Sequence, residues 1–186
     1  MRIISGYLKG KKINFLKNTT TRPLKDSVKE NIFNILTHSN LIKIRIEKSN
    51  VLDLYAGIGS FGIECISRGA QEVIFFERDN QAIKILKENL NLLSIISKSK
   101  LISGNVENTL INNFIKKFDI IFLDPPFNDS KFVNTLKLIK QNSLFKSNHI
   151  IVIHREIKTQ DNFQNLINIV DIKEYGRSKI IFGFFN

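Results

Sequence analysis

Short apolar runs alternate with segments of helical period from residue 50 onward, and no other feature of the chain constrains its fold as much. The apolar runs of this region are residues 51–55, 72–77, 100–103, 118–123 and 149–154. After the second run, apolar residues recur at the spacing of one helical face, at Ile83, Leu86, Leu90 and Leu93. Such alternation is typical of parallel strands joined by helices, so the chain is predicted to be α/β with a mostly parallel sheet.

The C-terminal region has a different spacing. Two apolar runs, 167–172 and 179–185, are separated by a stretch around Gly176 that is too short for a crossover helix. Strands joined in this way pair as an antiparallel hairpin. The sheet is therefore expected to end with antiparallel strands.

A basic extension, residues 1–24, precedes the main domain, which we place at residues 25–186. Within the extension, segments 2–5 and 12–15 have strand character and are joined through two glycines, so they can form a β-hairpin. The main domain opens with a helix that Asp26 or Ser27 is expected to cap. The helix is predicted to carry Phe33 on its flank and to bury a face made of Val28, Ile32, Ile35 and Leu36.

The chain has 28 Lys and Arg against 17 Asp and Glu, a formal charge of +11. This excess favours a polyanionic partner such as nucleic acid. A composition rich in Ile, Lys and Asn is the alternative explanation. Because basic residues precede the first acid, Asp26, the N-terminal ones are candidate contacts to RNA phosphates, against the alternative of a solvated surface. These candidates are Arg2, Lys9, Lys11, Lys12 and Arg22.

Cysteine and histidine usage gives no sign of a metal site. The single cysteine, Cys65, has no partner for an internal disulfide and is expected in the core. The histidines, His38, His149 and His154, do not have metal-ligand spacing. No apolar run approaches the ~18 residues of a membrane helix, and no signal core follows the N-terminus. We expect a cytoplasmic monomer without metal or membrane contact.

A glycine-rich loop follows the first strand of the predicted sheet. Gly57, Gly59 and Gly62 have the G-x-G-x-x-G spacing, and Glu77 lies about 20 residues further on. Glycines let the backbone approach a ligand closely, and an acid at the end of the second strand can accept hydrogen bonds from ribose hydroxyls. The loop predicts a nucleotide-type cofactor, unless its glycines only close a strand-to-helix turn.

Asp53, at the approach to this loop, favours S-adenosylmethionine over a dinucleotide. Both cofactors present an adenosine ribose to the same edge of such a sheet. A carboxylate would repel a pyrophosphate, whereas it would attract the cationic methionine end of adenosylmethionine.

The fourth strand ends in Asp124-Pro125-Pro126-Phe127, at the edge where open α/β folds hold their ligands. The prolines fix the backbone and remove two N–H donors, so acceptors remain. The Asp124 carboxylate and a carbonyl such as that of Pro125 could accept both hydrogens of an exocyclic amine, which would aim its lone pair at a methyl group. Phe127 could stack on the base. The alternative is that this corner only terminates a buried strand.

Together the loop and the corner resemble those of class I methyltransferases. The start Arg2-Ile3-Ile4-Ser5-Gly6, the block from Thr21 to Leu36 and the closing Tyr175-Gly176 are similar to the RsmD family. The resemblance covers nearly the whole chain. Its specific part is the Arg-Pro…Asp…Glu…Phe-Asn pattern of the block, whereas the glycine loop is generic.

The resemblance implies a three-layer Rossmann-like fold with a seven-stranded sheet, and an enzyme that methylates N2 of one guanine in bacterial 16S rRNA. Residues 124–127 would hold the guanine, and Arg22 with Pro23 would border the site. Adenosylmethionine would be bound by Asp53, Tyr55, Gly57, Gly59, Glu77, Arg78, Asn105, Val106 and Asp124. Many such enzymes present an acid to the adenine amino group where this chain has Asn105, whose side chain could still accept that hydrogen bond.

We therefore predict methyl transfer to 16S rRNA in a partly or fully assembled small ribosomal subunit. An adenine-N6 methyltransferase would use the same corner, although DNA enzymes of that kind often carry a recognition region that this short chain lacks. An NAD-dependent oxidoreductase fits the glycine spacing but does not explain residues 124–127 or the basic extension. A catalytically inert RNA-binding module is the third alternative.

Overall fold

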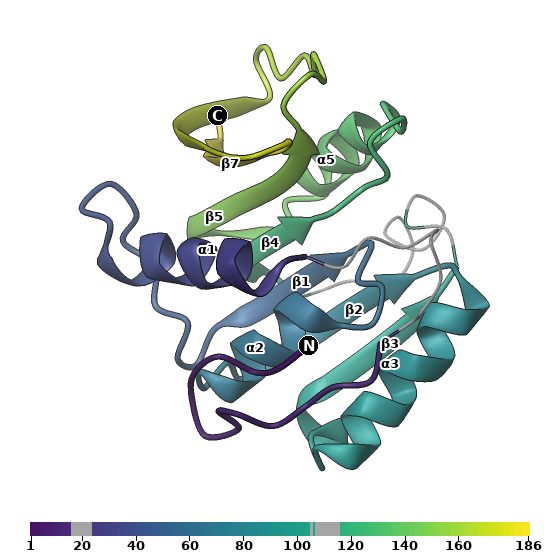
Figure 1. Cartoon of the computed structure of the whole chain (residues 1–186). Coiled ribbons are helices and arrows are strands. Elements are labelled where there is room, and N and C mark those ends of the chain that lie inside the picture. Colours follow the sequence, from purple (N-terminus) through teal and green to yellow (C-terminus); the bar gives the residue numbers. More distant parts are fainter. Residues whose placement is uncertain (16–23, 105, 107–115) are drawn as a thin grey trace.

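The computed structural model describes residues 1–15, 24–104, 106 and 116–186. Its centre is a seven-stranded sheet in the order β3-β2-β1-β4-β5-β7-β6, which places β3 at one edge and the β6–β7 pair at the other (Figure 1). The strands are β1 (Asn50–Leu54), β2 (Glu72–Glu77), β3 (Ser99–Ser103), β4 (Phe118–Leu123), β5 (Phe145–Glu156), β6 (Ile167–Tyr175) and β7 (Ser178–Phe185).

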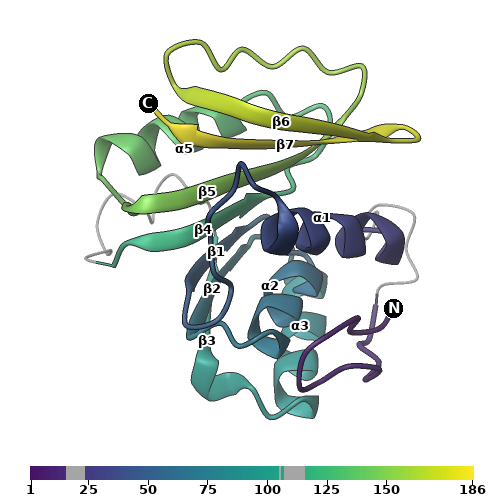
Figure 2. The ribbon, with the colours of Figure 1, turned by 90° about the vertical axis from the view of Figure 1, so that its left-hand side faces the viewer.

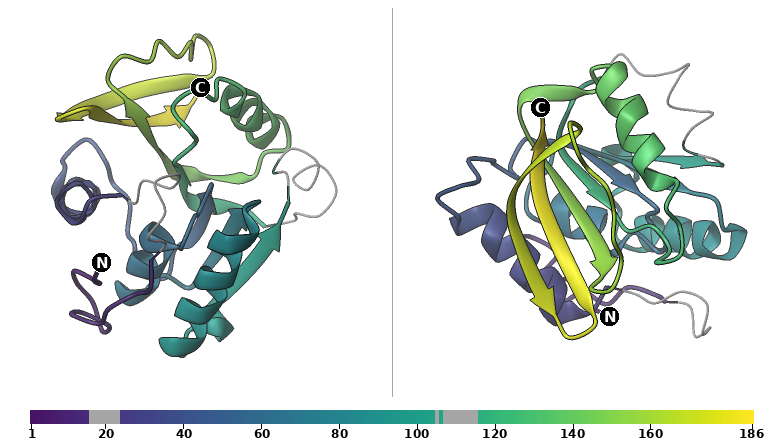
Figure 3. Two further views of the ribbon diagram at one scale, coloured as in Figure 1. Left: turned by 45° about the vertical axis from the view of Figure 1, so that its right-hand side comes forward. Right: turned by 90° about the horizontal axis from the view of Figure 1, so that it is seen from above.

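Strands β1 to β5 pair in parallel, and β7 pairs antiparallel with both β5 and β6. The seven strands lie at the seven apolar runs, and the predicted C-terminal hairpin is confirmed. It lies beyond β5, with the C-terminus at its end (Figure 3). Strand β5 is longer than predicted, because its pairing with β4 begins at Phe145.

Helices cover both faces of the sheet. Figure 2 shows α1 (Asp26–His38), α2 (Ser60–Ser67) and α3 (Asn80–Leu92) on one face and α5 (Phe132–Gln141) on the other. A 3-10 helix, η1 (Ile96–Lys98), precedes β3. Successive strand residues point to opposite faces, so Val51 belongs to the core cluster under α1 to α3 and Leu52 to the cluster under α5. Cys65 is buried in the first cluster, as predicted.

The first helix differs from its prediction at two points. Lys25 occupies the N-cap position without a side-chain hydrogen bond, so the predicted cap by Asp26 or Ser27 is wrong. Phe33, expected on the flank, is fully buried, whereas Ile35 is only partly buried. The reason is that α1 packs on α2 as well as on the sheet, and Phe33 stacks on Phe61 of α2 with ring centroids 5.1 Å apart.

The N-terminal segment packs against α2 through its backbone. Its two expected strands shorten to a single antiparallel bridge between Arg2 and Lys12. Much of its backbone bonds elsewhere: the N–H of Tyr7 donates to the carbonyl of Ser67, and that of Leu8 to the Ser67 hydroxyl. The segment contributes Ile3, Leu8 and Ile13 to the core under α1 to α3.

In the described part of the chain, no helix combines the length and the apolar character that crossing a bilayer requires.

Candidate functional site

A cavity of about 790 Å³ opens at the carboxyl ends of β1, β2 and β4. Ten of the residues predicted from the sequence for cofactor or base line it together, namely Asp53, Tyr55, Gly57, Glu77, Arg78, Val106, Asp124, Pro125, Pro126 and Phe127. Gly59 does not line the cavity, and Asn105 lies outside the described residues. Two distant motifs, the glycine loop and the Asp-Pro-Pro-Phe corner, thus share one cavity.

The three glycines of the loop have different surroundings. A Cβ on Gly57, whose φ is +55°, would meet no atom within 4 Å, so this position is open towards the cavity. A Cβ on Gly59 would lie 2.4 Å from Leu86, and one on Gly62 would lie 2.3 Å from Phe75. Gly57 therefore leaves room for a ligand, whereas Gly59 and Gly62 allow the close packing of α2 on its neighbours.

Glu77, at the end of β2, is fixed by backbone donors. One carboxylate oxygen accepts the N–H of Gly57 at 2.6 Å, and the other accepts those of Arg78 and Asp79 at 2.8 Å each. These bonds hold the glycine loop against the end of β2 and direct the carboxylate to the cavity wall. Ribose hydroxyls are donors that an acid in this place can bind.

Asp53 is a buried carboxylate, 1% exposed, on the cavity wall. Its Oδ2 accepts the N–H of Gly62 at 2.9 Å, while the buried Oδ1 has no hydrogen-bond partner among the described residues. Burial raises the pKa of Asp53 well above its usual range; the Gly62 N–H opposes this, and the charges of Asp124 and Glu77 add to it. An unsatisfied buried acceptor fits a cationic ligand group better than a phosphate.

The Asp-Pro-Pro-Phe corner is held by a residue that the sequence did not single out. Buried Arg155, on β5, donates to the carbonyl of Pro126 at 2.9 Å and to that of Phe127 at 3.0 Å. Asp161 binds the same guanidinium at 3.0 and 3.1 Å. Arg155 thus binds the carbonyls of Pro126 and Phe127 but not that of Pro125. No sequence signal links Arg155 to a corner so far away along the chain.

His154, the residue before Arg155, also belongs to the site. Its Nδ1 lies 2.8 Å from Oδ1 of Asp124, and its ring packs edge-on against Phe127 with centroids 5.7 Å apart. The side chain lines the cavity. The sequence pattern alone shows His154 only as one of three scattered histidines.

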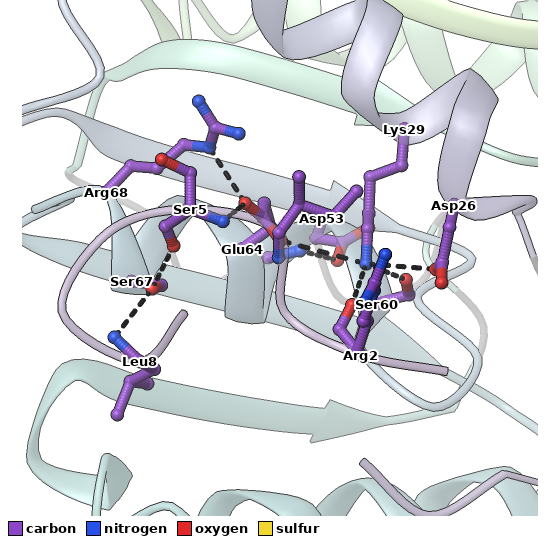
Figure 4. A network of polar contacts seen from close by, with 12 residues as sticks. Arg2, Ser5, Leu8, Asp26, Lys29, Asp53, Ser60, Glu64, Ser67 and Arg68 are labelled. Carbon is purple, nitrogen blue, oxygen red and sulfur yellow. Dashed lines mark hydrogen bonds and ion pairs between the residues drawn. The ribbon is translucent and has the colours of Figure 1, made fainter. Parts of the chain in front are cut away.

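A buried ionic network supports the loop from the side of α1 and α2 (Figure 4). Lys29 donates to the carbonyl of Arg2 at 3.0 Å and lies 3.4 Å from the hydroxyl of Ser60, which lines the cavity. Its ammonium is 3.7 Å from the carboxylate of Glu64. Burial lowers the pKa of Lys29, and the charges of Glu64 and Asp26 oppose that shift.

Glu64 joins this network to the N-terminal segment. Its carboxylate oxygens accept the N–H groups of Ile4 and Ser5 at 2.8 and 2.9 Å and pair with Arg68 (Figure 4). Arg2, Lys9, Lys11 and Lys12, the candidate RNA contacts in this segment, are exposed, and Arg22 lies outside the described residues. No group of three or more metal-ligating side chains occurs within residues 1–15, 24–104, 106 and 116–186.

Comparison with known proteins places the chain in a family. The chain matches the family described as "Conserved hypothetical protein 95" over residues 1–184. Ribosomal RNA small subunit methyltransferase D of Haemophilus influenzae is 35% identical over 162 residues, which cover 84% of this chain and 79% of that protein. The protein of the same name from Buchnera aphidicola subsp. Acyrthosiphon pisum is 35% identical over 156 residues, with 84% and 78% covered.

Solved structures agree with these matches. The Escherichia coli protein yhhF superposes with a TM-score of 0.83 at 25% identity, over 98% of this chain and 96% of that one. The strand order, the flanking helices and the antiparallel C-terminal strands are those of the class I methyltransferase fold. With the family match over nearly its full length, the chain belongs to the RsmD family of S-adenosylmethionine-dependent methyltransferases.

Proposed function

We propose that this protein methylates the exocyclic N2 of one guanine in 16S rRNA, the guanine at position 966, within a partly or fully assembled small ribosomal subunit. We further propose that it acts as a monomer in the cytoplasm, where that substrate is found. The observation that carries the proposal is the shared cavity, which joins the acceptors at Asp53 and Glu77 to the acceptor corner at residues 124–127. The relatives named as small subunit rRNA methyltransferases support the choice of RNA.

The acidic end of the cavity fits adenosylmethionine. Asp53 offers an unsatisfied oxygen to the ammonium of the methionine part, Glu77 faces the ribose, and Gly57 leaves room beside them. Bound there, the cofactor would supply a methyl group on a positively charged sulfur. A dinucleotide pyrophosphate would instead meet the carboxylates of Asp53 and Glu77, which argues against an oxidoreductase.

The corner fits the amine that accepts the methyl group. Asp124 would accept one hydrogen of the guanine amine and the Pro125 carbonyl the other, so that the nitrogen lone pair points towards the cofactor. Arg155 holds the neighbouring carbonyls and thus the position of the corner. Once the new N–C bond forms, the nitrogen loses a proton readily, so Asp124 orients the amine and need not be a strong base. Phe127 would stack on the base after it leaves its own stack.

Methyl transfer to small subunits lacking this modification tests the proposal. Labelled adenosylmethionine is incubated with such subunits and with wild-type protein or Asp124→Ala, and cofactor affinity is measured in parallel. We expect label in 16S rRNA with the wild type only, and nearly equal cofactor affinities. If Asp124→Ala lost affinity and transfer to the same extent, the division between a cofactor end and a base end would be wrong.

A further inference from the structure

The N-terminal segment, residues 1–15, buries three aliphatic side chains and exposes two aromatic rings. Ile3, Leu8 and Ile13 lie in the core, whereas Tyr7 is 58% exposed and Phe15 is 47% exposed. Aromatic side chains bury a large apolar area when they join a core, so two open rings on one short segment indicate a use other than folding. The three lysines that lie between the rings in the sequence are exposed as well.

We propose that this segment binds single-stranded RNA. The rings of Tyr7 and Phe15 stack on unpaired bases, and the lysines between them, Lys9, Lys11 and Lys12, contact phosphates. This inference deepens the proposed function and rests on it, because it states which form of RNA lies beside the target guanine. Every base has a flat face on which an aromatic ring can stack; an unpaired strand leaves that face accessible, whereas a duplex covers it with the next base pair.

The backbone around Tyr7 is fixed to the C-terminal end of α2. The N–H of Tyr7 donates to the carbonyl of Ser67 at 2.9 Å. The Ser67 hydroxyl accepts the N–H of Leu8 at 3.0 Å and donates to the carbonyl of Ser5 at 2.5 Å (Figure 4). Gly6 lies so close to α2 that a Cβ would be 1.8 Å from the Ser67 carbonyl oxygen. The exposed ring is thus carried by an ordered backbone, which lowers the entropy cost of binding.

Positive charge beside Tyr7 favours a nucleotide over an apolar partner. The ammonium of Lys98 lies 5.2 Å from the centre of the Tyr7 ring, within the range of a cation–π contact. Lys98 belongs to η1, and Lys9 follows Tyr7 on the segment itself, so cations from two parts of the chain lie near one ring. A base stacked on the ring would bring its phosphate to these cations, whereas an apolar peptide would have to remove water from them without compensation.

Phe15 lies at the other end of the segment, next to the glycine loop. Its neighbour Asn14 donates its N–H to Oδ1 of Asn89 at 2.8 Å, and the Asn14 carbonyl accepts from Nδ2 of Asn89 at 3.1 Å. The same Nδ2 donates at 3.2 Å to the carbonyl of Ile58, a residue that lines the cavity. The segment, which lies beside α2 and α3 (Figure 2), thus extends from Ser67 towards the glycine loop. RNA stacked on both rings would lead towards the cavity that holds the target base.

The test measures the affinity of the full chain for three probes of equal length: single-stranded oligoadenylate, a spacer oligomer that has the phosphates but no bases, and a blunt RNA duplex. Tyr7→Leu and Phe15→Leu keep an apolar side chain without a ring, whereas Tyr7→Phe and Phe15→Tyr keep the ring. Leu41→Ala, which shortens an exposed apolar side chain outside the segment, is the matched control. Melting temperature reports on folding, and methyl transfer to small subunits lacking the modification is measured in parallel.

We expect each leucine variant to bind oligoadenylate roughly 5-fold more weakly than the wild type, because one stacking contact is lost. The slope of log affinity against log salt should not change, since no charge is removed. Binding to the spacer oligomer and to the duplex should stay as in the wild type. The variants that keep a ring, and Leu41→Ala, should bind all three probes as the wild type does.

Leucine variants that bind oligoadenylate as tightly as the wild type would overturn the proposal. An equal loss of affinity for the spacer oligomer would overturn it as well, because that loss would come from charge or folding and not from stacking. So would a wild type that binds the two oligomers equally well. The proposed function has its own outcome: wild-type protein that methylates no guanine in small subunits would refute that function, whatever the oligomers show.

Discussion

Asp53 Oδ2 accepts the backbone N–H of Gly62 at 2.9 Å, so a buried carboxylate at the end of β1 holds the first turn of α2. The same side chain keeps its second oxygen, buried and without a partner in the described residues, on the cavity wall. Folding and cofactor binding therefore favour different charge states of Asp53. The fold would be served by a neutral side chain, whereas the cationic cofactor is served by a charged one.

Asp53→Asn is predicted to stabilise the ligand-free protein at neutral pH and to weaken cofactor binding by roughly 10-fold or more, since the variant cannot form the charge-assisted hydrogen bond. The pKa of Asp53 is raised in the folded state, so protonated Asp53 stabilises the fold. This stabilisation is fully present at a pH below the unfolded pKa and is lost as the pH rises through the folded pKa. The stability gained from the substitution should therefore grow with pH. Denaturant unfolding at several pH values, with and without adenosylmethionine, measures both effects. A variant that unfolds more easily but binds as tightly as the wild type would contradict this account.

The glycine loop allows a paired test of space for a ligand against space for packing. Gly57→Ala adds a methyl group where no protein atom lies within 4 Å, so it should cost only about 1–2 kcal/mol of stability for the left-handed backbone, and should weaken cofactor binding. Gly62→Ala places its Cβ against Phe75 and should destabilise the fold by about 1–3 kcal/mol through overpacking. Melting temperature and calorimetric affinity, measured on both variants, separate the two effects. If Gly57→Ala and Gly62→Ala lost the same amount of cofactor affinity under conditions in which both variants are folded, Gly57 would not belong to the cofactor site.

Arg155 and Asp161 form a buried ion pair. Substitutions of the two residues should have non-additive effects on the free energy of unfolding, whereas methyl transfer should depend on Arg155 alone. Arg155→Met leaves the Asp161 charge unpaired and should cost about 3–5 kcal/mol, whereas adding Asp161→Leu should recover part of that stability. The double variant still lacks the donor to Pro126 and Phe127, so methyl transfer should stay low, whereas cofactor affinity should remain close to that of the wild type. A double-mutant cycle of unfolding free energies, with transfer rates measured alongside, checks this. Full recovery of transfer in the double variant would show that Arg155 does not position the corner.

The exposed lysines of the N-terminal segment are predicted to contact RNA phosphates. Because Ile3, Leu8 and Ile13 of the same segment lie in the core, a deletion would also remove packing, and substitutions test the charge alone. Lys9→Gln with Lys11→Gln should weaken subunit binding and lower the slope of log affinity against log salt by up to about 0.7–0.9 for each lysine that binds a phosphate in the wild type. Lys137→Gln with Lys158→Gln, which removes two exposed lysines elsewhere, is the matched control. An unchanged slope in the N-terminal variant would make these lysines a solvated surface.

Hydrophobic periodicity was sufficient to predict the strands and the hairpin, because each strand corresponds to a short apolar run whose side chains are buried in the sheet. The glycine loop and the Asp-Pro-Pro-Phe corner were predictable for a related reason, since parallel strands bring their carboxyl ends to one edge. The cap of α1 and the burial of Phe33 were not, because they depend on how α1 packs on α2.

The supporting residues of the site were beyond the reach of local patterns. His154 and Arg155 lie 30 and 29 residues from Asp124 and Pro126, and only the pairing of β4 with β5 brings them together. Lys29 is a similar case: a lysine on a helix is usually solvated, yet this one is buried beside Glu64 because the N-terminal segment covers it.

Identification of the methylated nucleoside tests the central claim most directly. Small subunits that lack the modification are reacted with the protein and adenosylmethionine, and their 16S rRNA is digested to nucleosides for mass analysis. The account predicts N2-methylguanosine at a single position. Methyl groups on adenine N6 would contradict the choice of base, and no methylated nucleoside on subunits or on free 16S rRNA would contradict the proposed reaction.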